Sequence, residues 1–316
     1  MPLLKRSARA ATGGAASMQA GREGQRAAAA PAWPGDSRAS VWAGVVRACA
    51  NPRCSLGWFR PWRSRAAPVF EGGWCCSEAC AAAQVQAAIS REMDAPARAR
   101  DGHRHRVPLG LAMLEQGWIT QKALRAALES QRAAGCGKIG QWLVRLEAAS
   151  EEQVTRALGL QWGCPVLDIE SHHPEGLTAL LPRLLVDAYG ALPLRVAAGK
   201  ILYLGFEDRV DPALALAVER MTGLRVESGL VKESCFRPAH ARMLEANFPS
   251  LELAEAACDS ALASVLTKSV ERVRPVESRL VRVHDCLWLR MWLRPQGRPV
   301  PELGLIHDVM GTIGAH

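Results

Sequence analysis

The chain has 316 residues, of which 49% are hydrophobic and 22% are charged, so it is long enough to bury apolar cores in two or three domains. No segment approaches the roughly 20 consecutive apolar residues that a membrane helix requires, which excludes an integral membrane protein. No G-x-x-x-x-G-K-[ST] motif is present, which excludes a P-loop nucleotidase. The first residues lack the apolar core of a secretory signal, so we expect a reducing, cytoplasmic location.

The net charge of +8 is concentrated in the first third of the chain. Residues 1–106 hold 16 Lys or Arg against 7 Asp or Glu, whereas the remaining residues hold 23 against 24. We expect residues 1–40 to form a disordered leader, because they contain few large aliphatic side chains to offset the entropy lost on ordering. A basic segment can also bind nucleic acid, and this alternative stays open.

Five of the ten cysteines lie within residues 49–80, in the patterns CxxxxC and CxxxC. Two short cysteine pairs separated by about twenty residues can supply four thiolates to a tetrahedral zinc ion. The stretch WCCSEAC resembles the aromatic-Cys-Ser-x-x-Cys knuckle of treble-clef and ribbon-like zinc modules, which leaves Cys75 spare. Four thiolates close the site to water, so the metal would be structural. The predicted zinc ligands are Cys49, Cys54, Cys76 and Cys80.

Two other interpretations of the cysteines stay open: a disulfide pair, and reduced cysteines that act as small core residues. We assign residues 41–93 to a zinc-binding module with a short helix after Cys80, and residues 94–106 to a polar linker that carries His103 and His105. The aromatic residues between the two cysteine pairs would give a core too small to fold without a cross-link such as a metal or a disulfide. They are Trp58, Phe59, Trp62, Phe70 and Trp74.

Residues 108–131 and 138–161 align with each other at an offset of thirty residues. Each copy predicts a helix, a turn and a second helix, with Gly117 at the turn of the first copy. Thr120 and Ser150 are the expected N-caps of the second helices, and the residues after Ser150 form a capping box. Apolar residues at helical spacing predict that the two copies pack into a small four-helix bundle.

The repeated pattern is Leu-Gly or Ile-Gly, an apolar pair three and four residues after the Gly, and Gln near the end of the second helix. It resembles the N-terminal domain of the type II secretion and type IV pilus assembly ATPases, the general secretory pathway protein E family, over roughly residues 105–247. In some members this tandem motif binds cyclic di-GMP. The resemblance implies nucleotide-binding positions at Leu109, Gly110, Met113, Leu114, Gly117, Gln131, Lys138, Ile139, Gly140, Leu143, Val144 and Gln161.

The sequence departs from the nucleotide-binding version of this motif at three positions. Pro108 and Lys138 stand where the family begins each motif with Arg, and neither offers the planar fork of donors of a guanidinium. Glu147 replaces the turn glycine of the second copy and adds a negative charge. The alternative is that the retained residues only pack the helices.

Residues 162–247 are expected to form a small α/β subdomain, in which strands alternate with helices. Ala198-Gly199 is the predicted turn of a hairpin, and Asp211-Pro212 is the predicted start of a helix that ends at Gly223. We expect His172 and His173 to be solvated in a loop.

Residues 248–316 lie outside the resemblance and predict a short α/β tail. We expect an amphipathic helix over residues 251–273 and a strand hairpin that turns near His284-Asp285. Trp288 and Trp292 should share one face of a strand. The dipeptides His284-Asp285 and His307-Asp308 lack a third partner, so we expect no catalytic role for them.

The sequence therefore predicts an α+β protein with a zinc-ribbon or treble-clef-like module, a helical tandem repeat, a small α/β subdomain and an α/β tail. We expect a non-enzymatic adaptor or regulator that holds structural zinc and docks a protein partner of a secretion, pilus or signalling system. The resemblance implies cyclic di-GMP as its candidate ligand, and any effect on an ATPase would act in trans. The alternative is a nucleic-acid-binding protein that uses the zinc module and the basic N-terminal segment.

Overall fold

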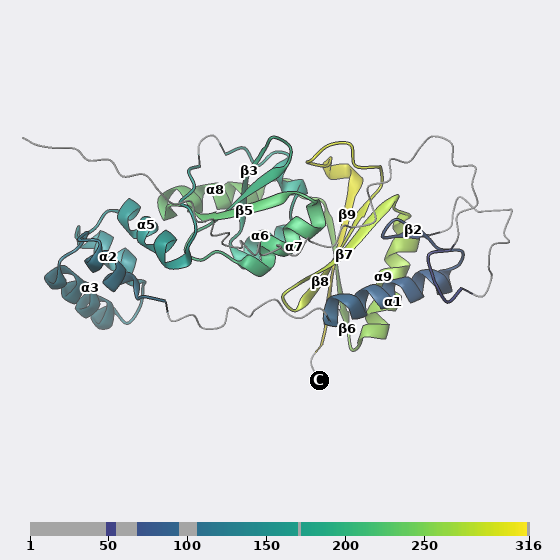
Figure 1. The fold of residues 1–316 in the computed structure, drawn as a ribbon, viewed down its shortest axis with the longest axis horizontal. Coiled ribbons are helices and arrows are strands. Elements are labelled where there is room, and N and C mark those ends of the chain that lie inside the picture. Colours follow the sequence, from purple (N-terminus) through teal and green to yellow (C-terminus); the bar gives the residue numbers. More distant parts are fainter. Residues whose placement is uncertain (1–48, 55–67, 95–105, 170–171, 315–316) are drawn as a thin grey trace, which may run out of the picture. The chain divides into compact units, whose positions relative to one another are not determined.

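The computed structural model describes residues 49–54, 68–94, 106–169 and 172–314, and every structural statement below concerns these residues (Figure 1). They form a mixed α+β fold with three small sheets. The expected leader of residues 1–40 lies outside the described residues, as do Trp58, Phe59, Trp62, His103 and His105. The predicted domain boundaries and the zinc-ribbon assignment stay predictions.

The cysteine-rich segment folds as a two-stranded hairpin followed by a helix. The hairpin turns at Glu71 and Gly72, which both have positive φ. The helix begins directly before Cys80 and presents one apolar face, with Val85, Ala88 and Ile89 buried. The elements are β1 (Val69–Phe70), β2 (Gly73–Trp74) and α1 (Glu78–Asp94).

Four helices form in the two aligned segments. The side chains of Thr120 and Ser150 accept the main-chain N–H groups of Ala123 and Gln153, so both predicted N-caps are confirmed. The Gln153 side chain accepts the Ser150 N–H in return, which completes the expected capping box. The helices are α2 (Leu109–Glu115), α3 (Gln121–Ala134), α4 (Ile139–Arg145) and α5 (Glu151–Trp162).

The next segment forms a three-stranded sheet with strand order β3-β4-β5. The hairpin turns at Ala198 and Gly199 as expected, and the parallel pair β4-β5 is connected by a helix that Asp211 caps through two N–H groups. The strands are β3 (Leu192–Ala197), β4 (Ile201–Phe206) and β5 (Arg225–Leu230). The helices are η1 (Leu177–Ala179), α6 (Arg183–Tyr189), α7 (Pro212–Thr222) and α8 (Glu233–Glu245).

The C-terminal segment forms a four-stranded sheet with strand order β6-β9-β8-β7. The predicted hairpin around His284 is confirmed, whereas the predicted helix over residues 251–273 is wrong in its first part, where β6 forms an edge strand. Strand β6 pairs in parallel with β9, a contact that local periodicity does not show. The elements are β6 (Ser250–Ala256), α9 (Asp259–Val273), β7 (Glu277–Val283), β8 (Cys286–Trp292), η2 (Leu303–Leu305) and β9 (Ile306–Ile313).

Apolar cores lie on both faces of the four-stranded sheet. Leu287 and Leu289 of β8 belong to a core shared with α1 and α9, whereas Trp288 and Trp292 belong to the core of the three-stranded sheet. The alternation follows from the two-residue period of a strand and confirms that both tryptophans share one face. The cysteine-rich helix and the C-terminal sheet therefore bury a common apolar surface.

One ion pair is buried in the core between the two larger sheets. Arg290 and Asp308 are each 1% exposed, and their side chains form two hydrogen bonds of 2.7 and 2.8 Å. The same guanidinium donates to the carbonyl groups of Ala179 and Leu180, which precede α6. Since a buried charge must be neutralised and hydrogen-bonded, this arginine joins β8 to β9 and to the chain before α6.

His172 differs from expectation. Its side chain is 7% exposed, and Nε2 lies 3.0 Å from the carbonyl oxygen of Pro193. Burial is the main cause of the lowered pKa of this imidazole. The prediction that His172 is solvated is therefore wrong, because its ring contacts β3 twenty-one residues later in the sequence, whereas the neighbouring His173 is exposed as expected.

A second buried carboxylate connects α1 to two distant elements. Glu92 is 1% exposed and accepts two hydrogen bonds from the guanidinium of Arg220 in α7, at 2.6 and 2.8 Å. It also accepts the main-chain N–H of Arg282 in β7 and a bond from Arg91. Burial raises the pKa of Glu92, but the bonds and charge of Arg220 outweigh it, so the pKa is lowered from its ordinary value of 4.5.

Replacing Glu92 by Gln should lower the free energy of unfolding by about 2 kcal/mol at pH 7, because a neutral amide replaces the buried carboxylate that accepts charged hydrogen bonds from Arg220. The ionised carboxylate stabilises the fold above the unfolded-state pKa, and this contribution is lost as the pH falls below 4.5 through the lowered pKa. Urea unfolding of both proteins should therefore show a difference that shrinks on acidification. Glu78→Gln, an exposed change in the same helix, is the control and should show no such difference.

Glu147→Gly should stabilise the chain by about 0.5–1 kcal/mol. Glu147 has a φ of 54° at the turn where the first copy has Gly117 at 69°, and a left-handed conformation costs a non-glycine residue about 1–2 kcal/mol. The larger unfolded-state entropy of glycine offsets part of the gain. The matched change Gly117→Ala should destabilise by about 1 kcal/mol, and a loss of stability in Glu147→Gly would contradict the argument.

Candidate functional site

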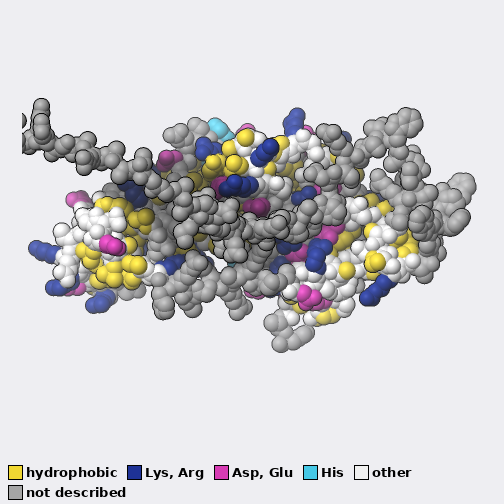
Figure 2. Space-filling model, viewed as in Figure 1, with side chains coloured by type: hydrophobic (Ala, Val, Ile, Leu, Met, Phe, Trp, Pro, Cys, Tyr) yellow, Lys and Arg dark blue, Asp and Glu magenta, His cyan; other side chains and the backbone are white. Residues whose placement is uncertain are grey.

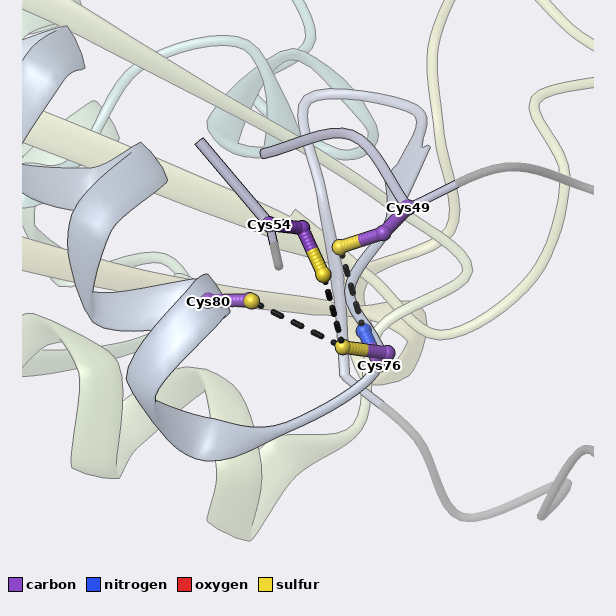
Figure 3. Close-up of side chains that lie close together, drawn as sticks. All are labelled: Cys49, Cys54, Cys76 and Cys80. Carbon is purple, nitrogen blue, oxygen red and sulfur yellow. Dashed lines mark hydrogen bonds between the residues drawn. The ribbon is translucent and has the colours of Figure 1, made fainter. Parts of the chain in front are cut away.

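Four cysteine side chains converge beside the start of α1 (Figure 3). Their sulfur atoms all lie within 4.8 Å of one another, which is the only such group of potential metal ligands among the described residues. The cluster contains the four cysteines that the spacing predicts as zinc ligands, namely Cys49, Cys54, Cys76 and Cys80.

Local turns bring the two cysteine pairs together. The side chain of Asn51 accepts the N–H of Arg53, and its carbonyl group accepts the N–H of Cys54, so the chain reverses between Cys49 and Cys54. This reversal is attached to the hairpin by a bond from Ala50 N–H to the carbonyl group of Trp74. In the second pair, the Ser77 hydroxyl accepts the N–H of Cys80 and so caps α1.

The sulfur separations fit a tetrahedral ion. The Sγ atom of Cys76 lies 3.5 Å from that of Cys54 and 3.6 Å from that of Cys80. A tetrahedral zinc with Zn–S bonds of about 2.3 Å requires sulfur atoms about 3.8 Å apart. The main-chain N–H of Cys76 donates to Cys49 Sγ at 3.5 Å, and Asn51 Nδ2 donates to Cys80 Sγ at 3.4 Å. Such N–H donors orient and stabilise thiolate ligands.

The thiols of the cluster differ in their readiness to ionise. Burial opposes ionisation of Cys80, but bonding to Ser77 and Asn51 outweighs it and lowers the pKa to about 7. The pKa of Cys76 is raised to about 12, first by burial and then by its contacts with Cys54 and Cys80. A thiol surrounded by other sulfur atoms loses its proton less readily, because they disfavour a further negative charge. A bound divalent metal ion would reverse this effect and favour the thiolate.

Cys75 packs against the cluster, but its sulfur atom is not one of the four that converge. Its side chain is fully buried, and burial is the main cause of a pKa raised to about 12. Successive residues after a strand point in opposite directions, so only one of Cys75 and Cys76 reaches the cluster. The structure thus places Cys75 in a small core with Cys80 and Ala81 of α1.

The predicted nucleotide-binding positions fall into three classes of exposure. Gly110, Met113, Gly140 and Leu143 are buried. Leu109, Leu114, Gln131, Ile139, Val144 and Gln161 are half-buried, and Gly117 and Lys138 are exposed. The two buried glycines allow close packing, because a Cβ atom would lie 2.5 Å from Leu124 at the first and 2.6 Å from Val154 at the second.

The two glutamines make equivalent hydrogen bonds. Gln131 Nε2 donates to the carbonyl group of Gly137, and Gln161 Nε2 donates to that of Val107, both at 2.7 Å. The two acceptors are thirty residues apart, as are the two donors. Each glutamine therefore holds the carbonyl group that precedes the first helix of the other segment. The sequence pattern shows both glutamines but not this exchange of contacts.

Charge around Lys138 does not favour an anion. Its ammonium group pairs with the carboxylate of Asp208, which lies between β4 and α7. Nearby, Gln141 donates to Glu233 and the Ser234 hydroxyl donates to Glu151. The carboxylates of Asp208, Glu233 and Glu151 therefore occupy side-chain donors that a phosphate group would otherwise contact.

The two His-Asp dipeptides do not meet. His284 Nε2 lies 2.7 Å from Asp211, whereas Asp308 is paired with Arg290. His307 Nδ1 contacts the Ser250 hydroxyl at 2.8 Å, a cross-strand bond between β6 and β9. The His284 contact joins the turn between β7 and β8 to the residue that caps α7, and the His307 contact joins β9 to β6.

Sequence reasoning missed Glu71 and Glu92 as structural residues. Glu92 lies on a helix where a glutamate is normally solvated, and only the fold brings Arg220 to it. Asn51 carried a usable signal, because Asn before a turn commonly accepts a main-chain N–H two residues later.

Comparisons with known proteins match part of the chain. The type IV pilus assembly ATPase PilB of Thermus thermophilus is 30% identical over 148 residues, which cover 46% of this chain and 16% of that protein. PilB of Myxococcus xanthus is 27% identical over 148 residues, which cover 46% of this chain and 25% of that protein. Bacteriophage adsorption protein B of Escherichia coli K12 is 32% identical over 125 residues, or 39% of this chain and 16% of its own.

Among solved structures, MshE with cdg is 24% identical over 44% of this chain and 99% of its own, with a TM-score of 0.35. The N-terminal domain of XpsE is 23% identical over 42% of this chain and 92% of its own, with a TM-score of 0.31. No protein-family model matches the chain.

The chain spans a quarter or less of the length of these curated relatives. Within the described residues, none of the helices combines the length and apolar character needed to cross a membrane. The sequence resemblance is confirmed for slightly less than half of the chain, which in that part is similar to type IV pilus assembly ATPases.

Proposed function

We propose that this chain is a non-enzymatic, cytoplasmic adaptor or regulator whose cysteine-rich module is held by a structural zinc ion. The observation that carries the zinc assignment is the convergence of four sulfur atoms within 4.8 Å. Zinc suits this donor set because it accepts four thiolates in tetrahedral geometry and has no redox chemistry of its own. When bound, the ion would neutralise the thiolates and join the turn at Asn51 to the start of α1.

A structural role follows from the donor set. Four protein ligands leave no position for water or substrate, in contrast to catalytic zinc sites with three protein ligands. The hairpin strands have two residues each, so main-chain bonds alone give them little stability. A metal ion supplies the missing constraint on this short segment.

The adaptor role rests on the partial similarity to pilus ATPases. Parts of the chain match both proteins named as pilus ATPases and one named as a bacteriophage adsorption protein. Partial matches to proteins with such different names are more consistent with docking or sensing than with the activity of one of them. The partner we propose is a protein of a secretion or pilus system.

Cyclic di-GMP is the small ligand we propose for the helical segments. The Leu-Gly or Ile-Gly starts, the apolar pairs and both glutamines of the motif are kept. Affinity should be low, because Lys138 is paired with Asp208 and Pro108 has no side-chain donor.

The nucleic-acid alternative has no supporting observation in the described part of the chain. On the face shown in Figure 2, the described Lys and Arg side chains are interspersed with Asp and Glu. Nucleic-acid binding by counterion release requires a concentrated basic surface. Binding of duplex DNA that weakens steeply between low and physiological salt would favour this alternative over the adaptor.

The zinc proposal is tested by metal analysis of two matched variants. Wild-type protein should contain about one zinc per chain, Cys76→Ser should lose it, and Cys75→Ala should keep it. The adjacent cysteines distinguish ligation from a general effect of losing a thiol, because only Cys76 lies in the sulfur cluster. Equal zinc content in wild type and Cys76→Ser, or equal loss in both variants, would contradict the assignment.

The ligand proposal is tested by calorimetric titration with cyclic di-GMP. Restoring arginine with Pro108→Arg and Lys138→Arg should strengthen binding about tenfold or more, since a bidentate contact to a guanine edge contributes about 1–3 kcal/mol. Lys122→Arg, an exposed change in α3, should leave the affinity unchanged. Absence of binding to both wild type and the double variant would exclude this ligand.

A further inference from the structure

Asn51 begins the turn that carries Cys54, and it uses both ends of its side-chain amide. Its Oδ1 atom accepts the main-chain N–H of Arg53 at 2.9 Å, and its carbonyl group accepts that of Cys54 at 3.0 Å. Its Nδ2 atom donates to the Sγ atom of Cys80 at 3.4 Å, a contact between residues 29 positions apart. One half-buried side chain therefore connects the two cysteine pairs.

The main chain fixes the direction of the Asn51 amide. The oxygen and nitrogen atoms of a side-chain amide are nearly identical in shape, but a main-chain N–H can only donate. The atom that faces the Arg53 N–H must therefore be the oxygen, which leaves the NH₂ group to face Cys80. Pro52 occupies the second position of the turn, where its restricted φ favours this conformation. The direction of the donor thus follows from the local turn and needs no metal ion.

This donor faces the cysteine of the cluster that solvent reaches least. Cys80 is 8% exposed, whereas the other three cysteines are half-buried. Four thiolates carry more negative charge than one divalent ion cancels, so their sulfur atoms require N–H donors or water. Water approaches the half-buried cysteines more readily than Cys80. The Asn51 N–H, beside the Ser77 hydroxyl, therefore supplies at Cys80 the stabilisation that solvent gives elsewhere.

We propose that Asn51 is a positioning residue of the metal site, and that its amide N–H holds the Cys80 thiolate in place as a ligand. The proposal rests on the proposed zinc ion. It goes beyond formation of the turn, because the turn requires only the side-chain oxygen of Asn51, whereas Cys80 requires the nitrogen.

Aspartate separates these two roles. Asn51→Asp keeps an oxygen for the Arg53 N–H, and aspartate suits the first position of such a turn as well as asparagine does. It replaces the donor by a carboxylate oxygen, which places a negative charge against the Cys80 thiolate. Asn51→Ala removes both the acceptor and the donor but adds no charge. A role in the turn alone makes alanine the more harmful change, and a role at Cys80 makes aspartate the more harmful one.

Competition for zinc with a chromophoric chelator, measured at equilibrium on the full chain, tests this proposal. Asn51→Asp should bind zinc about 10–100-fold more weakly than wild type, as is typical when the partner of a metal ligand is lost, and more weakly than Asn51→Ala. Arg53→Ala keeps the main-chain N–H and changes only an exposed side chain, so it should bind as wild type does. Wild-type affinity in Asn51→Asp, or weaker binding by Asn51→Ala than by Asn51→Asp, would overturn the proposal.

Cobalt(II) substitution gives a readout that a change in the turn alone would not move. A hydrogen bond lowers the energy of the sulfur lone pairs. Loss of the Asn51 donor should therefore shift the thiolate-to-cobalt charge-transfer band to longer wavelength in both Asn51 variants. Cys75→Ala, a change that borders the cluster without removing one of its four sulfur atoms, should leave the band in place. An unshifted band in both Asn51 variants would refute the role of the donor.

Failure of this proposal can be distinguished from failure of the zinc proposal. If the wild-type chain binds neither zinc nor cobalt, the zinc proposal fails and the role of Asn51 fails with it. If the wild-type chain binds both metals and Asn51→Asp matches it in affinity and spectrum, only the role of Asn51 is refuted. Far-UV circular dichroism controls for folding and should be the same in all variants, because α1 is packed in the C-terminal core through Val85, Ala88 and Ile89.

Discussion

The buried carboxylate of Glu92, paired with the partly exposed guanidinium of Arg220, is the group on which the arrangement of the described chain depends most. The carboxylate lies at the end of α1, the guanidinium on α7, and a third bond reaches the main chain of β7. A charge placed in an apolar interior is tolerated only where its partners are fixed, so the three elements have one compatible placement. The cysteine-rich helix is therefore a layer of the C-terminal sheet as well as the end of its own module.

Features that depend on a few neighbouring residues could be predicted from the sequence. The N-caps at Thr120 and Ser150 and the helix start at Asp211 each follow from the chemistry of a single turn. In each case the side chain and its main-chain partner lie within a few residues, so tertiary structure does not alter the outcome.

Features that depend on distant partners could not be predicted. The segment from residue 250 to 256 has apolar spacing compatible with a helix, but β9 pairs with it from more than fifty residues away in the sequence. Burial of His172 likewise depends on the carbonyl group of Pro193. Glu92 gave no signal at all, because a glutamate in an amphipathic helix is ordinarily solvated.

The residues that match the family motif pack the helices, and a ligand that binds at this motif would have to contact the same residues. Buried Met113 and Leu143 fill the helical core, and Gly110 and Gly140 allow the helices to approach, so these four residues would be retained without a ligand. The glutamines differ, because each already uses its amide N–H to hold the other segment. A ligand that recruited Gln131 or Gln161 would have to replace that contact and would thereby loosen the attachment of the two segments. Binding at this surface would therefore be coupled to the packing of the helices, which is the property that a sensing element requires.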